Sequence, residues 1–183
     1  MPVTIRDVRT MTTQYEGQRL TIVKLLTSEP GLYGLGCATF TQRYHAVVAA
    51  LEHHIKPFVI GRDVQRIEEL WQMMMVSGYW RNGPVLNNAL SGIDQALWDI
   101  KGKALGEPVY RLLGGGYRTS LRVDASNMFQ ETPEATAERA QAARDAGYSA
   151  VKFGWEPFGE DPARDCAYLE AIRRAIGEDM ELM

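Results

Sequence analysis

The amino-acid sequence predicts an α+β domain followed by the first units of a parallel β/α architecture, and three observations predict it. The first forty residues hold β-rich runs separated by turn signals. Residues 46–105 carry apolar side chains at helical spacing. From residue 121 onward, strands alternate with helices. The sequence therefore predicts an antiparallel meander with helices, and then a parallel sheet.

The meander is predicted from three β-rich runs, at residues 3–9, 20–26 and 32–38. Pro30 and Gly31 form a turn signal between the last two runs, which favours an antiparallel connection. Residues 14–18 are polar and include a glycine, so we expect a flexible loop between the first two strands.

Three helices are expected next, over residues 46–57, 63–75 and 85–105. Pro57 is expected to limit the first of them at its C-terminal end. Gly106 and Pro108 are expected to end the third helix. Its predicted apolar stripe consists of Ala89, Leu90, Ile93, Ala96, Leu97, Ile100 and Ala104. The triple glycine at residues 114–116 is a plausible domain seam, which predicts domains at residues 1–116 and 117–183.

After the seam, strands are predicted at residues 121–126 and 150–155, with another beginning at Glu181. Thr132 and Asp161 each precede a proline, as an N-cap residue precedes the first helical position. The two helices are expected to end at Gly147 and Gly177. This rhythm is typical of βα units in a parallel sheet.

Two and a half βα units do not close an architecture, since an eight-unit barrel takes roughly 250 residues. The last strand would also expose an unpaired edge. We therefore expect the chain to be the N-terminal piece of a longer protein, truncated within its second domain. The alternative is a natural short domain.

Composition and charge exclude several function classes. The net charge of −3 gives no basic stripe for a phosphate backbone, so no nucleic-acid partner is expected. No stretch reaches the roughly 18 apolar residues of a membrane span, and the N-terminus does not resemble a secretory signal. We expect a cytoplasmic protein without a membrane partner. Cys37 and Cys166 are expected to be free thiols, with a disulfide as the alternative. The three histidines lack zinc-site spacing.

Residues 89–115 read ALSGIDQALWDIKGKALGEPVYRLLGG, which closely resembles the signature helix of the enolase superfamily, in its mandelate racemase/muconate lactonizing enzyme group. Residues 38–43 and 77–84 resemble acid-sugar dehydratases near mannonate dehydratase, whereas residues 151–159 look more like other dehydratases of the group. The resemblance implies an α+β capping domain followed by the first units of a (β/α) barrel.

The resemblance also implies a chemistry. Members of the group bind Mg²⁺ through three carboxylates on the third, fourth and fifth barrel strands, so we expect the metal ligands beyond Met183 and none within this chain. The metal stabilises an enediolate that forms when the proton next to a carboxylate is removed. In dehydratases this intermediate then expels a β-hydroxyl. The implied partners are a small sugar acid and further copies of the chain in a homo-oligomer.

Lys152 is the candidate catalytic residue. It lies in an apolar run that predicts a buried strand, and a lysine is rarely buried without a partner or a chemical role. Side chains alternate along a strand, so Lys152 and Gly154 share one face, while Val151, Phe153 and Trp155 face the helices. Many relatives carry Lys-x-Lys here, and the second lysine is their base. By alignment Lys152 takes the first position, where it would stabilise a carboxylate or enediolate. The alternative is a structural lysine, either paired with a carboxylate or extended to the rim.

Four residues are candidates for substrate contact: Tyr15, Arg43, Trp80 and Arg81. Tyr15 and Glu16 match by position a capping-domain loop that relatives use as a lid, and the alternative is a solvated loop. Arginine suits the carboxylate of a sugar acid. Arg43, Trp80 and Arg81 are candidates for substrate or subunit contact, and surface exposure or packing within the capping domain is the alternative. We expect Asp94 and Asp99 to be structural, hydrogen-bonded at the domain seam.

The sequence thus predicts the N-terminal part of a Mg²⁺-dependent acid-sugar dehydratase. One alternative is a racemase or epimerase of the same superfamily, although a two-base mechanism would lack the base at position 154. The other is a non-catalytic capping-domain module.

Overall fold

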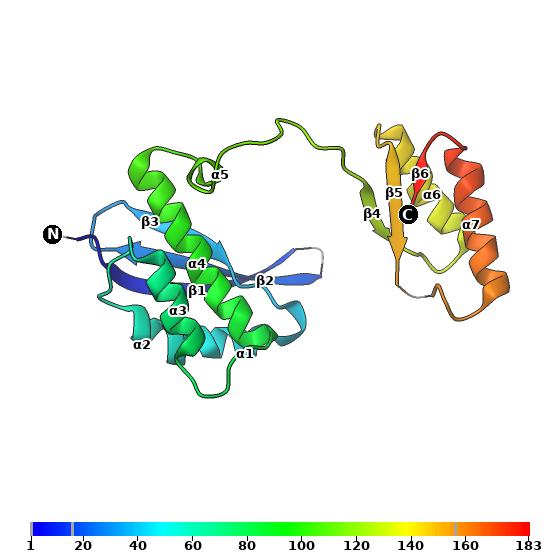
Figure 1. Ribbon diagram of the computed structural model, residues 1–183. Coiled ribbons are helices and arrows are strands. Elements are labelled where there is room, and N and C mark those ends of the chain that lie inside the picture. Colours follow the sequence, from blue (N-terminus) through cyan, green and yellow to red (C-terminus); the bar gives the residue numbers. More distant parts are fainter. Residues whose placement is uncertain (1, 16, 156) are drawn as a thin grey trace. The chain divides into compact units, whose positions relative to one another are not determined.

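The computed structural model describes residues 2–15, 17–155 and 157–183. The chain folds as two compact units, Met1–Tyr117 and Arg118–Met183, which are described separately (Figure 1). Glu16, one of the residues matched to the lid loop, lies outside the described residues. Within the described part, no helix combines the length and the apolar character that crossing a membrane requires.

The first unit begins with a three-stranded antiparallel sheet in the order β1-β2-β3. The strands are β1 Ile5–Tyr15, β2 Gln18–Thr27 and β3 Tyr33–Cys37, so the predicted meander is confirmed. The prediction of a flexible loop is wrong for Gln14, Tyr15 and Gln18, because strand pairing continues to Tyr15 opposite Gln18. Gly17, with a φ of 80°, supplies the left-handed backbone of the tight turn.

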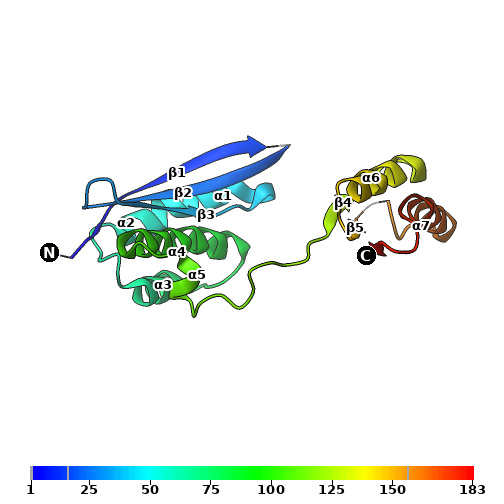
Figure 2. The same cartoon turned by 90° about the horizontal axis from the view of Figure 1, so that it is seen from above.

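Helices cover one face of this sheet, as Figure 2 shows. After the 3₁₀ turn η1 (Thr41–Arg43), α1 spans Tyr44–Ala50 and runs through the π-helical turn η2 (Leu51–Ile55) into α2 (Lys56–Val59). The prediction that Pro57 limits the helix is wrong. After the π-turn, Pro57 occupies the first turn of α2, where the N–H that proline lacks is not needed.

The next helix, α3, spans Ile67–Val76 and begins four residues later than predicted. Asp63, the expected start, forms an isolated bridge with Thr4. Its Oδ1 also accepts a hydrogen bond of 2.9 Å from the backbone N–H of Gln65, which makes a local turn instead of a helix.

The long helix α4 (Pro84–Leu105) packs across β2 and β3, and the short α5 (Val109–Leu112) follows it. Its predicted apolar stripe is buried except for Ala104, which is exposed. Gly106, with a φ of 67°, ends α4 as predicted. Helix and strand meet without intervening side chains, because a Cβ added to Gly34 or Gly36 would lie 1.9 Å from a backbone oxygen of α4.

The second unit contains a parallel sheet in the order β4-β5-β6 with two helices. Its elements are β4 Ala125–Met128, α6 Pro133–Asp145, β5 Ala150–Gly154, α7 Pro162–Ile176 and β6 Glu181–Leu182. The predicted βα rhythm is therefore confirmed. The first strand begins later than expected, because Leu121 and Val123 are exposed and unpaired in the sheet.

Both helix starts follow the predicted capping device. The Thr132 hydroxyl accepts a hydrogen bond of 3.2 Å from the N–H of Ala135. Asp161 Oδ1 accepts one of 2.9 Å from the N–H of Ala163. Both helices bury apolar side chains against the same face of β5. The other face of β5 is left to carry the candidate catalytic residue.

Candidate functional site

Lys152 stands on the open face of the parallel sheet, opposite to the face that the helices cover. Its neighbours Val151 and Phe153 are buried in the helix–sheet core, whereas Lys152 is exposed. The expectation of a wholly buried strand is therefore wrong: Ala150, Val151 and Phe153 are buried, whereas Lys152 is exposed and Gly154 is half-buried. Lys152 lies beside Ser126 of β4 in the parallel register.

Gly154 lies two residues further along the same face, beside Met128 of β4. A Cβ added there would meet no atom within 4 Å, and the backbone of Gly154 is not left-handed. The glycine is therefore not required by packing or by backbone conformation. Trp155, expected to face the helices, is 77% exposed and has a φ of 67°, because the strand ends at Gly154 and the chain turns away.

Lys152 makes no hydrogen bond or ion pair with any residue that the structure describes. Glu181 shares this face of the sheet, since it lies beside Ala150 in the register. However, its carboxylate is 2.6 Å from the Arg122 guanidinium, which also donates a hydrogen bond of 2.8 Å to the Ser149 hydroxyl. The ammonium of Lys152 thus remains available for an external anion.

The structure brings together two of the four predicted substrate-contact residues. Trp80 and Arg81 line one pocket in the first unit, and neither Tyr15 nor Arg43 lines it. Tyr15 lies at the end of β1 and is 67% exposed. Arg43 is exposed in η1, where its guanidinium donates a hydrogen bond of 2.8 Å to the carbonyl of Gln42.

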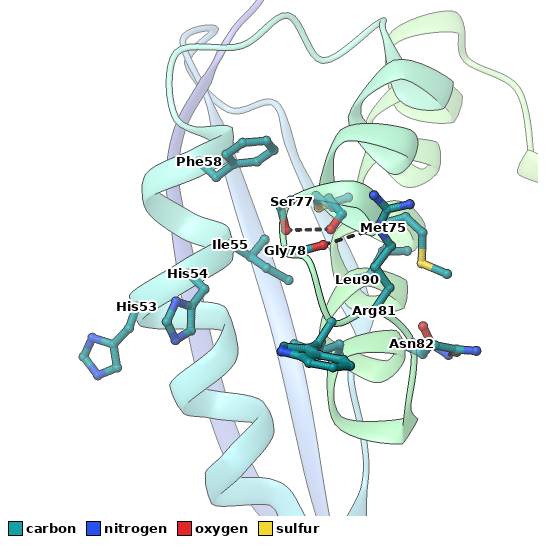
Figure 3. A pocket seen from close by; sticks show the side chains of 14 residues that line it. His53, His54, Ile55, Phe58, Met75, Ser77, Gly78, Arg81, Asn82 and Leu90 are labelled. Atoms are coloured by element: carbon teal, nitrogen blue, oxygen red, sulfur yellow. Dashed lines mark hydrogen bonds between the residues drawn. The ribbon is translucent and has the colours of Figure 1, made fainter.

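The pocket lies between η2, the end of α3, the following loop and the start of α4, and has a volume of about 430 Å³ (Figure 3). Fourteen residues line it: His53, His54, Ile55, Phe58, Met74, Met75, Ser77, Gly78, Trp80, Arg81, Asn82, Leu86, Asn87 and Leu90. Sequence reasoning missed the histidines and the asparagines. The adjacent pair His53–His54 is visible in the sequence, but its nearness to residue 81 depends on tertiary packing.

Asp99 is structural, as predicted, although its partners lie within the first unit. Its Oδ2 accepts hydrogen bonds of 2.8 Å from the N–H of Leu35 and 2.6 Å from Lys103. Asp94 differs from the prediction, since it makes no hydrogen bond to any described residue. Burial, together with the negative charge of Glu68, raises the pKa of Asp94 above its ordinary value.

A metal site is not formed by the part of the chain that the structure describes, because no three of its His, Cys, Asp and Glu side chains come together. Cys37 and Cys166 are both exposed free thiols. The described residues can therefore present a cation to an anionic ligand, but they do not offer the oxygen cluster that Mg²⁺ requires.

Comparison with known proteins places the chain in a family. Residues 1–114 match the family described as mandelate racemase / muconate lactonizing enzyme, N-terminal domain. A D-galactonate dehydratase family member from Pantoea ananatis is 52% identical over 155 residues, which cover 85% of this chain and 37% of the relative. A further member, from Musicola paradisiaca, is 60% identical over 117 residues, which cover 64% of this chain and 28% of the relative. Another, from a Streptomyces species, is 41% identical over 181 residues, which cover 94% of this chain and 39% of the relative.

Solved structures show the same likeness. A Pantoea ananatis enolase with bound D-gluconate and Mg superposes with a TM-score of 0.83 at 39% identity, over 98% of this chain and 52% of that one. A putative dehydratase from Zymomonas mobilis superposes with a TM-score of 0.86 at 32% identity, over 99% of this chain and 54% of that one. The chain spans less than two-fifths of these curated relatives and about half of these solved chains. The chain belongs to the mandelate racemase / muconate lactonizing enzyme family of the enolase superfamily.

Proposed function

We propose that this chain is the N-terminal part of a Mg²⁺-dependent acid-sugar dehydratase. The observation that carries the proposal is Lys152, which stands on the open face of a parallel sheet without a partner among the described residues. The relatives of the chain are named as members of the D-galactonate dehydratase family. Support for the metal and for the substrate class comes from the related Pantoea enolase, which holds D-gluconate and Mg.

The reaction removes the proton at C2 of the sugar acid and expels the C3 hydroxyl as water, which leaves an enol of a 2-keto-3-deoxy acid. Negative charge builds up on the substrate carboxylate when the C2 proton leaves. Mg²⁺, when bound by ligands outside the described residues, would supply the main stabilisation of that charge. The ammonium of Lys152 adds a second positive charge, fixed on a strand.

Gly154 decides which variant of the chemistry the site can support. By resemblance, many relatives carry their base at this position, and a glycine has no side chain that could accept a proton. A racemase that works with two opposed bases would lose one of them, whereas a dehydratase needs only one base on the side of the departing proton. We therefore favour dehydration over racemisation or epimerisation, with the base supplied from outside the described residues.

The remaining parts of the proposal rest on the sequence. Tyr15, Arg43, Trp80 and Arg81 stay predicted substrate contacts. A cytoplasmic location and a homo-oligomeric assembly are proposed on the same basis. A non-catalytic capping-domain role is the competing hypothesis, and Lys152 separates the two, since an assembly module has no use for an unpaired cation at this position.

The test compares Lys152→Met and Lys152→Arg in the product of the whole reading frame, with D-gluconate and other sugar acids in the presence of Mg²⁺. We expect Lys152→Met to lower kcat about 10²–10³-fold, since it removes a preorganised charge, and Lys152→Arg to retain part of the activity. Lys101→Met is the control, because Lys101 lies over the ring of Trp98 in the first unit. Unchanged kcat in Lys152→Met would refute this role.

A further inference from the structure

The pocket beside Trp80 has the size and the charge of a site for a small anionic ligand. Its volume of about 430 Å³ falls within the range of small-molecule sites. Its ionisable lining side chains are His53, His54 and Arg81, and no aspartate or glutamate lines it among the described residues. Figure 3 shows His54 nearer to the cavity, with the ring of His53 directed away from Arg81. The lining therefore favours a negatively charged group.

Arg81 has capacity to bind such a group. Its Nε donates a hydrogen bond of 3.3 Å to the carbonyl of Gly78, as the dashed line in Figure 3 marks. Its two terminal nitrogens bind no described residue, and it forms no ion pair with the described carboxylates. A guanidinium with both terminal nitrogens free can hold a carboxylate through two parallel hydrogen bonds.

The loop that carries Arg81 is held in one shape by its own hydrogen bonds. The Ser77 hydroxyl donates to the carbonyl of Met74 at 2.8 Å. The Asn87 side chain donates to Asn82 Oδ1 at 2.8 Å, while Asn82 adopts a φ of 76°, which a non-glycine residue rarely does. A fixed loop loses less conformational entropy when a ligand binds.

The rest of the pocket suits a carbon skeleton. Met74 and Leu90 are buried at its floor, and Met75 is half-buried beside them. Trp80 is 87% exposed and packs edge-on against Tyr79, at 5.4 Å between ring centroids. An exposed indole next to methionine side chains offers a surface for an aromatic ring, an aliphatic chain or the C–H face of a sugar.

We propose that this pocket binds an organic carboxylate, with the carboxylate on Arg81 and the carbon skeleton against Trp80 and Met75. The inference builds on the prediction that Trp80 and Arg81 contact a substrate, and it can be tested without turnover because the pocket lies wholly within the first unit. The carboxylate can come from two sources: the polyhydroxylated sugar acid, or an acid with an apolar body.

Calorimetric titration of the 183-residue chain tests the site with D-gluconate and with hydrocinnamate. Sorbitol and hydrocinnamyl alcohol are their neutral counterparts. We expect one carboxylate to bind at a single site and its neutral counterpart not to bind. Arg81→Gln should weaken that binding at least about tenfold, since it removes a charged bidentate contact. Arg6→Gln is the matched control and should bind like the unchanged chain, because Arg6 is exposed on β1 and does not line the pocket.

Arg81-dependent binding of D-gluconate would support the site with the sugar acid as its ligand, and Arg81-dependent binding of hydrocinnamate would support it with an apolar acid. Absence of binding by both acids up to about 10 mM would overturn the proposal, provided that thermal melting shows a folded chain. Undiminished binding by Arg81→Gln, or an equal loss of binding in Arg6→Gln, would also overturn it. None of these outcomes alters the Lys152 test of turnover, so the two failures are distinguishable.

Discussion

At the scale of single residues, Lys152 places a positive charge on one face of β5, while Gly154 on the same face has no side chain that could act as a base. The two positions share the open face of β5, and neither is confined by packing. Lys152 is free of described partners, so its positive charge is not neutralised within the part of the chain that the structure describes. The strand itself is therefore suited to electrostatic stabilisation but not to proton transfer at position 154.

Two aspartates of the first unit respond to their surroundings in opposite ways. Lys56 Nζ lies 2.8 Å from Asp7 Oδ1, and this hydrogen bond lowers the pKa of Asp7. Burial and the charge of Glu68 raise the pKa of Asp94. The contribution of Asp94 to stability is present below its ordinary pKa of about 3.9, and is lost as the pH rises through the raised value. The contribution of Asp7 is present above that ordinary value and is lost at lower pH.

We therefore predict that Asp94→Asn raises the Tm of the first unit by about 2–4 °C at pH 7, since it removes a charge that burial disfavours. The gain should vanish when the pH is lowered below about 4. Thermal melts from pH 3 to pH 7 measure both effects. Asp7→Asn is the control of opposite sign, with a lower Tm at pH 7. A loss of stability in Asp94→Asn at pH 7 would show that this carboxylate has a partner.

At the scale of elements, the contact of α4 with β3 depends on glycine. A Cβ on Gly36 would lie 1.9 Å from the carbonyl oxygen of Gly92, and a backbone oxygen cannot move aside as a flexible side chain can. Gly92 itself faces Val23 and Ala38 at close range. The close approach lets the long helix bury its apolar stripe directly on the sheet.

Gly36→Ala is accordingly expected to destabilise the first unit by about 3 kcal/mol or more, because helix and strand must separate to admit the methyl group. Chemical denaturation followed by circular dichroism gives the free energy of unfolding. Gly78→Ala is the matched control, since a Cβ there would meet its nearest atom at an ordinary 3.5 Å. That variant should stay within about 0.5 kcal/mol of the unchanged chain. Equal effects of both substitutions would mean that the α4–β3 contact tolerates a side chain.

Elements with local signals could be predicted from the sequence, whereas those that depend on pairing could not. The starts of α6 and α7 could be predicted from Thr132 and Asp161, because an N-cap residue followed by proline is a pattern of neighbouring residues. The sequence of residues 14–18 is polar and resembles a loop, yet Gln14 pairs with Arg19 and Tyr15 pairs with Gln18 across the two strands. The prediction that Pro57 ends a helix failed because the π-turn before it shifts the helix register, so that Pro57 lies in the first turn of α2.

The candidate sites follow the same rule. Lys152 can be found from the sequence, since a charge within an apolar strand is a local feature. The pocket could not be found in this way, because His54 and Arg81 are brought together only when η2 packs near the loop before α4.

At the scale of the whole molecule, the two units differ in what they contribute. The first unit supplies a helix-covered antiparallel sheet and a pocket with a basic lining. The second supplies the start of a parallel sheet, on which Lys152 has no partner among the residues that the structure describes. The relatives that match this chain are longer than it. Two of them are 59–60% identical to it over 117 residues, and another is 41% identical over 181 residues.

The most direct test of the dehydratase proposal is a sugar-acid screen that compares the product of the whole reading frame with the 183-residue chain. Formation of 2-keto-3-deoxy acids is measured with Mg²⁺ and with excess EDTA. We predict Mg²⁺-dependent dehydration of at least one acid by the whole product, and none by the 183-residue chain, whose described residues form no metal site. A whole product without Mg²⁺-dependent turnover on any acid, or turnover by the 183-residue chain alone, would contradict the proposal.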